Sequence, residues 1–440
     1  MTVRADTISL LNAYQSALYY DAKLQSAKKD NAIQHQEAEK AGAVFYPQAR
    51  MTLFQGRSAS DSSTPKYSTF SPLTGPAIGG GNAHHNYDSK NYNFSIRQSL
   101  FNKAGFASFN QARESAYKSD AVLNFEKSNF MTKIIASYLD ILLALDNIEY
   151  SDFQKINVEK QLDSAEKRFQ AGVGTVTEIN EAKANLENII AKKLEWDNAL
   201  EYSKRVLESY IGYYPEHVLR LDIKKLPKVK PIPSNIETWI NIALEKNQEI
   251  IAAQHDVEIA AAGIDKSIAG HYPTLDLIAS KTYTESQNEI TIGSRYVTDS
   301  LGLQLEIPIY YGGYVNADTH ESITKLEQSR DELTQKQRDV KSNVRKYFHE
   351  IINGLSRLGA FEESVQSNEI AFIGTQKGFE SGFRNNIDVL NAQEKLYLAK
   401  HDLSKERYSL IYNRTLLKQT AGTLTEQDIQ EISEWLCSRN

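Results

Sequence analysis

Two five-residue stretches begin like the H-E-x-x-H motif, in which two histidines four residues apart bind zinc on one helix face. They are HESIT at 320–324 and HEIIN at 349–353, and each lacks the second histidine. Without that ligand the helix face offers no zinc site. His84 and His85 follow GGGN, where solvated side chains are the favoured interpretation. We therefore expect no bound metal.

The sequence also lacks the common motifs of nucleotide-binding proteins and serine hydrolases. The sequence contains no P-loop, no G-x-G-x-x-G and no G-x-S-x-G. Its one cysteine, Cys437, cannot form a disulfide framework or a cysteine metal site within one chain. The net charge of −6 is mild, and basic residues are interleaved with acidic ones, which argues against a nucleic-acid footprint. We expect no enzyme, no cofactor and no nucleic-acid partner.

A charged, glycine-containing stretch, SGFRNNIDVLNAQ at 381–393, interrupts what otherwise reads as continuous helix. It aligns with AGVGTVTEINEAK at 171–183, which places Gly172 on Gly382 and Glu178 on Asp388. Glycine adopts positive φ at little cost, so both stretches read as turns between helices. Taken alone, an acidic or basic residue beside such a glycine is usually a helix cap or a solvated surface charge.

The elements that position these turns occur in two copies, which indicates an internal repeat. The first copy spans 1–223 and the second 236–440, and the linker KKLPKVKPIPSN at 224–235 contains three prolines that forbid regular helix. Each copy reads as a helix, a strand pair, a long helix, a break and another helix. The expected strands are 48–58, 90–101, 274–286 and 296–309, and the expected helices after them are 103–170, 175–211, 315–380 and 386–421.

The strands alternate apolar and polar residues. Leu301, Leu303 and Leu305 alternate with Gly302 and Gln304, and the same period occurs between Tyr92 and Leu100. Period-two alternation gives a strand one apolar and one polar face. Such strands lie either on a soluble core or in a barrel wall between lipid and water. The segments 58–88 and 286–295 between the paired strands are polar and rich in turn formers, and we expect exposed loops there.

Aromatic residues gather at the strand ends, where a membrane interface would place them. They could equally cap a soluble core. These residues are Phe45, Tyr46, Phe101, Phe106, Tyr272, Tyr310, Tyr311 and Tyr314.

The long helices show a coiled-coil spacing. Ile134, Tyr138, Ile141, Leu145 and Ile148 step by four, three, four and three residues. No run approaches 18 consecutive apolar residues, so we expect no transmembrane helix. A transmembrane β-strand needs only about 9–11 alternating residues and stays possible. Four strands cannot close a barrel, which needs about eight, so a membrane sheet would require several chains.

Several long motifs resemble the TolC family of outer-membrane export ducts. They include GHYPTLDLIAS at 270–280, IPIYYGGYVN at 307–316, RFQAGVGTVTEINEAKANLE at 168–187, GYYPE at 212–216 and the run from DVLNAQ to TEQD at 388–428. The resemblance covers nearly the whole chain in order. It implies an α+β membrane protein with two tandem repeats, a trimeric twelve-stranded outer-membrane β-barrel and a periplasmic α-barrel of coiled-coil helices.

The resemblance also implies a function and partners. The homotrimer would be a channel-tunnel that exports drugs, secreted proteins or both, and would dock to a periplasmic adaptor (membrane fusion) protein and an inner-membrane ABC, RND or MFS transporter. It would lie in the Gram-negative outer membrane, in contact with lipid. The start MTVRADTISLL has no secretory signal, and for an outer-membrane protein this would reflect a mature or trimmed form. The stop at Asn440 would likewise reflect a trimmed tail. The alternative is a soluble periplasmic coiled-coil adaptor or scaffold.

By resemblance, Asp388 matches the first of two aspartates that form a carboxylate ring at the narrowest point of the periplasmic mouth. The second of these family positions is Asn391 here, one helical turn away on the same face. Three converging carboxylates would favour cations. With one charged ring, we expect weaker cation capture than in relatives with two.

The resemblance further implies a network of contacts that keeps the mouth closed. Arg384 matches the family's arginine, and Phe379 replaces a tyrosine and cannot donate its hydroxyl bond. An arginine can engage a carboxylate and a second acceptor together. The expected partners are Glu178, Thr177 and Gln161, and the hairpin tips expected to contact the adaptor are Gly172, Val173, Gly174, Thr175, Gly382, Phe383 and Asn385.

Overall fold

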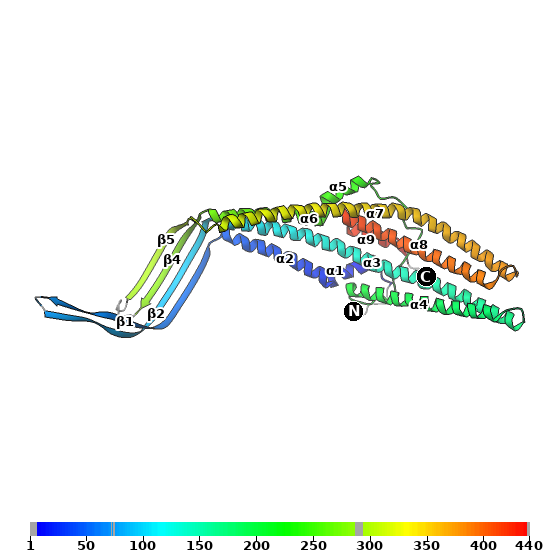
Figure 1. Ribbon diagram of the computed structural model, residues 1–440, viewed down its shortest axis with the longest axis horizontal. Helices are drawn as coiled ribbons and strands as arrows, with labels where there is room; N and C mark the ends of the chain where they lie inside the picture. The colour runs from blue at the N-terminus through cyan, green and yellow to red at the C-terminus, as the bar shows by residue number, and fades with distance from the viewer. Residues whose placement is uncertain (1–6, 72, 74, 287–293, 438–440) are drawn as a thin grey trace. The chain divides into compact units, whose positions relative to one another are not determined.

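The computed structural model describes residues 7–71, 73, 75–286 and 294–437 (Figure 1). Its elements repeat in the same order and at nearly the same length. Helix α1 (Leu10–Tyr20) and helix α5 (Ile236–Lys246) each have 11 residues. Helix α2 (Ala22–Gly42) and helix α6 (Gln248–Ile268) each have 21 residues, and the 3-10 turns η1 (Ala43–Phe45) and η2 (Ala269–His271) follow them. The two halves of the sequence therefore share one structural plan.

The second part of each repeat is a pair of strands followed by two long helices. Strands β1 (Gln48–Ser71) and β2 (Gly75–Phe101) precede α3 (Lys103–Gln170) and α4 (Val176–Ile211). Strands β4 (Thr274–Ser286) and β5 (Ser294–Glu306) precede α7 (Tyr314–Glu380) and α8 (Asn386–Thr420). At 1.5 Å per residue, α3 is about 100 Å long.

The four strands form one antiparallel sheet in the order β1-β2-β4-β5 (Figure 1). The cross-strand register places Leu53 opposite Tyr92, Tyr92 opposite Tyr283, and Tyr283 opposite Val297. The Tyr92 and Tyr283 rings stack with centroids 5.5 Å apart. Because alternate side chains share a face, one face of the sheet is largely apolar across all four strands, and the ion pair of Lys281 and Asp299 interrupts it.

The apolar face of the sheet is exposed, and the other face is polar. On β5, Leu301 is 76% exposed, and Leu303 and Leu305 are exposed as well. On the polar face, Arg97 of β2 bonds to the buried carboxylate of Asp276 on β4. A soluble sheet buries its apolar face, so this arrangement is typical of a wall whose apolar side contacts lipid.

The strand boundaries correct two expectations from the sequence. Residues 58–88 were expected to form a loop, but β1 and β2 continue through most of this segment as a long antiparallel hairpin. Backbone ladders need no apolar alternation, so the polar composition did not reveal the pairing. Strand β5 ends at Glu306, three residues before the expected end, because Pro308 has no N–H to donate. Within the expected loop at 286–295, residues 287–293 lie outside the described ranges.

The chain divides into two compact units that do not follow the two repeats. One unit comprises residues 1–33, 117–255 and 330–440, and the other comprises 34–116 and 256–329. Each unit takes segments from both sequence repeats, so neither repeat folds as a separate domain. The second unit contains the sheet, and Phe45 packs there against Phe106 and Phe109, with centroids 5.2 and 5.1 Å away.

The first unit contains the hydrophobic cores and the helix hairpins. One core joins α1, α3 and the ends of α4 and α8 to α9 (Glu426–Glu434), and a second joins α5, α7 and α8. In the first core the Tyr138 hydroxyl lies 2.9 Å from the carbonyl oxygens of both Ile8 and Leu219. A short sheet pairs β3 (Arg220–Leu221) with β6 (Leu436–Cys437). Residues 222–235 contain no helix or strand.

Helix α3 qualifies the expectation that the chain has no transmembrane helix. Among the described residues, it is the one helix long and apolar enough to cross a membrane by length and composition. Its apolar window is 61% buried within the chain. Ile134, Ile135 and Ile141 belong to the first hydrophobic core, so their apolar character has a packing explanation.

Candidate functional site: the helix-hairpin tips

The two interhelical turns have the same backbone geometry. After α3, the N–H of Gly172 donates to Phe169 O (2.9 Å) and that of Val173 to Arg168 O (3.0 Å). After α7, Gly382 donates to Phe379 O (3.0 Å) and Phe383 to Gly378 O (2.8 Å). Gly172 and Gly382 have φ of 77° and 81°, a region that side-chain-bearing residues rarely adopt. Glycine at these positions therefore ends each long helix and reverses the chain.

Side-chain caps begin the returning helices. The Thr175 side chain accepts a bond from Glu178 N (3.3 Å) at the start of α4. At the start of α8, Asn385 and Asp388 form a reciprocal capping box: Asp388 N donates to Asn385 Oδ1 (2.8 Å), and Asn385 N donates to Asp388 Oδ2 (3.3 Å). Asp388 thus has the capping role that the sequence offered as the alternative to a pore charge, and the two roles are compatible.

The tips present apolar side chains to their surroundings. In Figure 1 the α3–α4 and α7–α8 turns lie at the same end of the first unit. Phe383 is 88% exposed and Val173 is 68% exposed. Apolar residues this exposed at a loop tip are typical of a contact surface.

The structure brings Arg384 of the expected gate network near Asp388 of the expected constriction. Arg384 Nη1 lies 3.9 Å from Asp388 Oδ2, a weak contact within one turn, and the Arg384 side chain is 61% exposed. Thr177 and Asn391 are also exposed. No contact of Arg384 with Glu178 or Thr177 is found within the described residues of this single chain. The expected network between neighbouring coils stays a prediction.

A contact that the sequence did not reveal joins the two hairpins. The guanidinium of Arg168, at the end of α3, lies over the Phe379 ring at the end of α7, 5.2 Å from its centroid. A cation over an aromatic face is attracted by the ring's quadrupole. The sequence indicated only that Phe379 lacks the hydroxyl of the family's tyrosine. In the structure its ring makes a cation–π contact instead. The alignment of the two repeats pairs Phe169 with Phe379, and nothing in it indicates a contact between Arg168 and Phe379.

Further from the tips, α8 is held against α3 by a group of side-chain hydrogen bonds that we call the anchor. Tyr408 donates to Asp146 Oδ2 (2.7 Å), Tyr150 and Ser404 share a bond of 2.8 Å, and His401 Nδ1 lies 2.7 Å from Asn147 Oδ1. Burial raises the pKa of Asp146, and the Tyr408 hydroxyl partly opposes that shift. Burial also raises the pKa of Tyr408, so this hydroxyl stays protonated as a donor.

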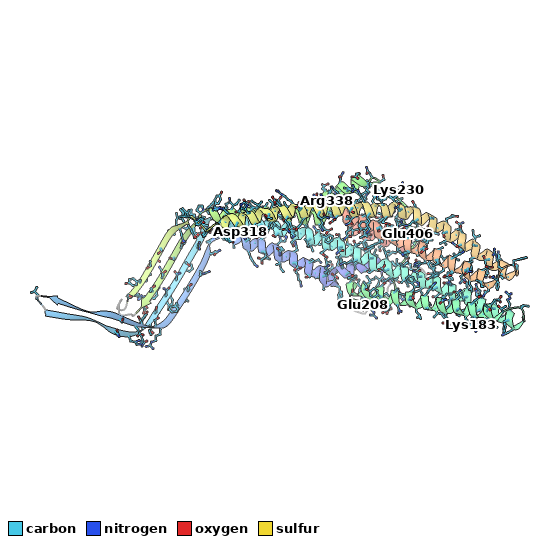
Figure 2. The ribbon with its side chains drawn as sticks, in the orientation of Figure 1. Lys183, Glu208, Lys230, Asp318, Arg338 and Glu406 are labelled. Atoms are coloured by element: carbon cyan, nitrogen blue, oxygen red, sulfur yellow. The ribbon has the colours of Figure 1, made fainter. Side chains whose placement is uncertain are left out.

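Helix α8 also bonds to α4 and α7. Trp196 of α4 donates to the Tyr397 hydroxyl (3.1 Å), and its ring lies 5.5 Å from that of His401. Glu406, labelled in Figure 2, accepts two bonds from Arg357 of α7, at 3.1 and 2.9 Å. A bidentate pair of this kind fixes the relative orientation of the guanidinium and the carboxylate as well as their distance. Helix α8 therefore connects the two hairpins.

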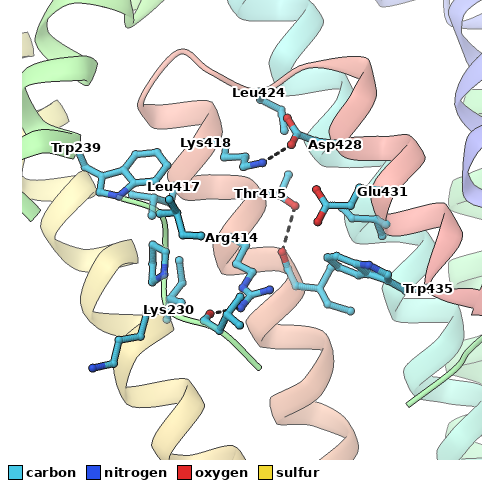
Figure 3. A pocket seen from close by; sticks show the side chains of 16 residues that line it. Lys230, Trp239, Arg414, Thr415, Leu417, Lys418, Leu424, Asp428, Glu431 and Trp435 are labelled. Atoms are coloured by element: carbon cyan, nitrogen blue, oxygen red, sulfur yellow. Dashed lines mark hydrogen bonds and ion pairs between the residues drawn. The ribbon is translucent and has the colours of Figure 1, made fainter. Parts of the chain in front are cut away.

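A pocket of about 200 Å³ lies in the first unit between the linker, α8 and α9 (Figure 3). Several of its polar side chains bond to protein partners: Trp239 Nε1 donates to Pro233 O (2.7 Å), Arg414 bonds to Val229 O, and Lys418 pairs with Asp428. These bonds fasten the linker to the helices. The pocket is explained by that structural role.

The candidate metal ligands were located as well. His84 bonds to Asp61 across the β1–β2 hairpin. In the part of the chain that the structure describes, no group of three or more histidine, cysteine, aspartate or glutamate side chains is placed to hold a metal ion.

Comparisons with known proteins agree with this architecture. The family described as "Outer membrane efflux protein" matches residues 13–213 and 239–423. The chain is 28% identical to the alkaline protease secretion protein AprF of Pseudomonas aeruginosa, over 98% of this chain and 87% of the relative. It is 27% identical to the proteases secretion protein PrtF of Dickeya chrysanthemi, over 99% of this chain and 92% of the relative. A crystal structure of CusC matches with a TM-score of 0.78 and 18% identity, over 96% of this chain and 95% of CusC.

The anchor predicts a pH dependence of stability. Burial lowers the pKa of His401 below its ordinary 6.5, Asp402 partly opposes that shift and Lys405 reinforces it. Below that ordinary value, the unfolded chain therefore binds a proton that the folded chain does not, and stability falls as the pH drops from 6.5 towards the folded pKa. We expect His401→Gln to reduce the difference in thermal midpoint between about pH 7.5 and about pH 5.5.

The control for this measurement is His217→Gln, because His217 is an exposed histidine of the same unit. That variant should keep the difference shown by the unmodified protein. If His401→Gln and the unmodified protein show an equal pH dependence of the thermal midpoint, His401 does not contribute to that dependence and the prediction is wrong.

Proposed function

We propose that this chain, which belongs to the outer membrane efflux protein family, is the outer-membrane duct of a machine that secretes proteins. It is an outer-membrane export channel: the four strands contribute to a barrel that three chains complete, and the long helices form an α-barrel. The alternative of a soluble scaffold is not supported, because the apolar face of the sheet is exposed and the family is one of membrane channels.

The proposed cargo rests on the relatives that match the chain almost from end to end. Both AprF and PrtF carry names that refer to protease secretion. Each comparison covers at least 98% of this chain, so it includes the sheet and both hairpin tips. Drug efflux is the second candidate, which the family description favours.

The proposed assembly is a homotrimer that engages a periplasmic adaptor protein and an inner-membrane transporter of the ABC, RND or MFS class. Three chains bring six hairpin tips together. The exposed Val173 and Phe383 supply an apolar contact surface, and the turns around Gly172 and Gly382 present it outward. These tips are the proposed adaptor site.

The proposed constriction is a ring formed by Asp388 of three chains, with Asn391 one helical turn further along α8. The capping box directs the Asp388 carboxylate towards the start of the helix, and the side chain stays 36% exposed. A partly exposed carboxylate can attract cations while it caps the helix.

The proposed lock of the closed mouth is Arg384, with Glu178, Thr177 and Gln161 as candidate partners on a neighbouring chain. Within the described residues the Arg384 guanidinium makes a long contact with Asp388, and its five donors give it the capacity to bond further acceptors. Arg168 over Phe379 holds the two hairpins of one chain together.

Secretion can be tested in a Pseudomonas aeruginosa strain that lacks AprF. Because the match spans both ends of the duct, we expect this protein to restore at least part of the alkaline protease secretion, measured in the culture medium. Drug susceptibility of the same strain is measured in parallel. Restored drug resistance without restored protease secretion would favour the efflux alternative.

Arg384→Ala should raise the single-channel conductance in planar bilayers, because it removes the contacts that are proposed to hold the periplasmic mouth closed. The matched control is Arg338→Ala, which removes an arginine of α7 that is not part of the proposed gate (Figure 2). Equal conductance in Arg384→Ala and the unmodified protein would remove Arg384 from the lock.

Asp388→Asn should reduce the preference for cations, because it removes the charge but keeps an oxygen that can accept the capping bond. The reversal potential in a salt gradient is the measurement. Asn391→Asp should have the opposite effect, since it adds a second charged ring. Unaltered reversal potentials in both variants would exclude the proposed constriction.

A further inference from the structure

One ion pair lies on the apolar face of the sheet, in the middle of two strands. The Lys281 ammonium of β4 lies 3.0 and 3.4 Å from the two carboxylate oxygens of Asp299 on β5. Both side chains are exposed, and the register places Phe94 of β2 beside them. Charged side chains that face lipid cost free energy, so such a pair is a candidate functional site.

The pair is flanked by apolar residues in both directions along the strands. Residues that lie opposite one another across the strands form rows. The row nearer the helices consists of Ile96, Ala279 and Leu301. The row on the other side of the pair consists of Tyr92, Tyr283 and Val297. The pair therefore lies within the apolar region of the wall and not at its rim.

A charged row marks the edge of the apolar region on the side away from the helices. It consists of Lys90, Glu285 and Arg295. Lys90 Nζ lies 3.5 Å from Glu285 Oε1, and the Arg295 guanidinium lies 5.1 Å from the centroid of the Tyr283 ring. One apolar row separates the ion pair from this edge, whereas the rows of Leu301, Leu303 and Leu305 lie on the helix side. Because the helical end of the channel is periplasmic, the pair lies in the outer leaflet.

A groove lies on the apolar face beside the ion pair. It has a volume of about 340 Å³, and the residues that line it include Phe94, Ile96, Ala279 and Leu301 as well as Lys281 and Asp299. The hollow has a cause in the register, which places the small Ala279 between Ile96 and Leu301. Sites for small molecules have volumes of about 300–1,000 Å³. An apolar groove that adjoins a charged pair matches a molecule with an acyl chain and a polar headgroup.

The hairpin of β1 and β2 indicates the class of lipid. Pairing between β2 and β4 ends at Ser89 and Ser286, but β1 and β2 stay paired as far as Ser71 and Gly75. Residues 75–88 of β2 therefore continue past the end of β4, over about 48 Å of strand length. A phospholipid headgroup layer is about 5–8 Å thick. A polar hairpin of this length matches the thicker hydrophilic layer that the sugars of a glycolipid form.

We propose that Lys281, Asp299 and the adjoining groove bind one phosphorylated glycolipid of the outer leaflet on each chain. Lys281 donates to a phosphate oxygen, and Asp299 accepts hydrogen bonds from sugar hydroxyls. One acyl chain lies in the groove over Ala279.

The charges around the groove favour an anionic headgroup. Lys281, Lys90 and Arg295 supply three cations, and Asp299 and Glu285 supply two carboxylates. Basic side chains at a membrane surface attract anionic lipids. All of these residues belong to strands β2, β4 and β5 of one chain, so the site is complete without a residue from a neighbouring chain.

Native mass spectrometry of the full-length trimer, purified in detergent, measures the bound lipid directly. Diphosphoryl lipid A is the probe, and lipid A without its phosphates is the headgroup control. We expect one bound lipid A per chain and a preference of about tenfold for the phosphorylated form, because the charged hydrogen bond to the phosphate is lost in the control. Equal binding of the two forms, or equal binding of phosphatidylglycerol, would overturn the assignment to a phosphorylated glycolipid.

Two variants test the two parts of the site. Lys281→Gln removes the phosphate donor, and Ala279→Phe fills the groove without changing any charge. Each should weaken the binding of diphosphoryl lipid A about tenfold. The matched control is Lys325→Gln, which removes a lysine of α7 that pairs with Glu321 (2.6 Å) and lies outside the sheet. If both site variants assemble and bind the probe like the control and the unmodified protein, the proposal is wrong; if one does not assemble, the other decides.

This inference concerns the lipid around the barrel and goes beyond the proposed cargo, so the two can fail separately. A protein that restores protease secretion but retains no lipid A would contradict the lipid site alone. A trimer that retains lipid A but restores no secretion would contradict the proposed cargo alone.

Discussion

The edges of the four-stranded sheet impose the constraint on which the rest of the assembly depends. Strands β1 and β5 lie at the two ends of the strand order, and each has one side without a partner strand in the described chain. In lipid no water can satisfy those backbone groups, so other copies of the chain must pair with them. Helices α3 and α7 follow β2 and β5 along the chain, so each strand pair of the barrel is continuous in sequence with a long helix.

Internal duplication supplies two hairpins with the same turn but different side chains. Gly172 and Gly382 have nearly the same φ, and the same two backbone bonds follow each helix end. The returning helices differ: α4 begins at Thr175 with one side-chain bond, whereas α8 begins at Asn385 with a reciprocal pair. The second hairpin also contains the buried Asn386. The same backbone turn thus presents candidate lock partners in the first repeat and the candidate constriction charge in the second.

Local patterns predicted the features whose causes are local. The long helices contain no proline, and they end at glycines that adopt positive φ, so their boundaries could be predicted from the sequence. The β1–β2 hairpin through 58–88 was missed because its pairing depends on backbone bonds, which composition does not reveal. The Arg168 contact with Phe379 joins segments about 200 residues apart. The periodicity of apolar residues along the chain does not predict a contact of this kind.

Asp388 shows how a helix cap and a proposed constriction charge can occupy one position. Its carboxylate accepts the backbone bond that starts α8, so its direction is tied to the first turn of that helix. Any motion of α8 therefore moves the charge together with the helix. Asn386 lies two residues earlier and is buried, so the first turn of α8 is packed on one side, whereas the Asp388 side chain stays partly exposed.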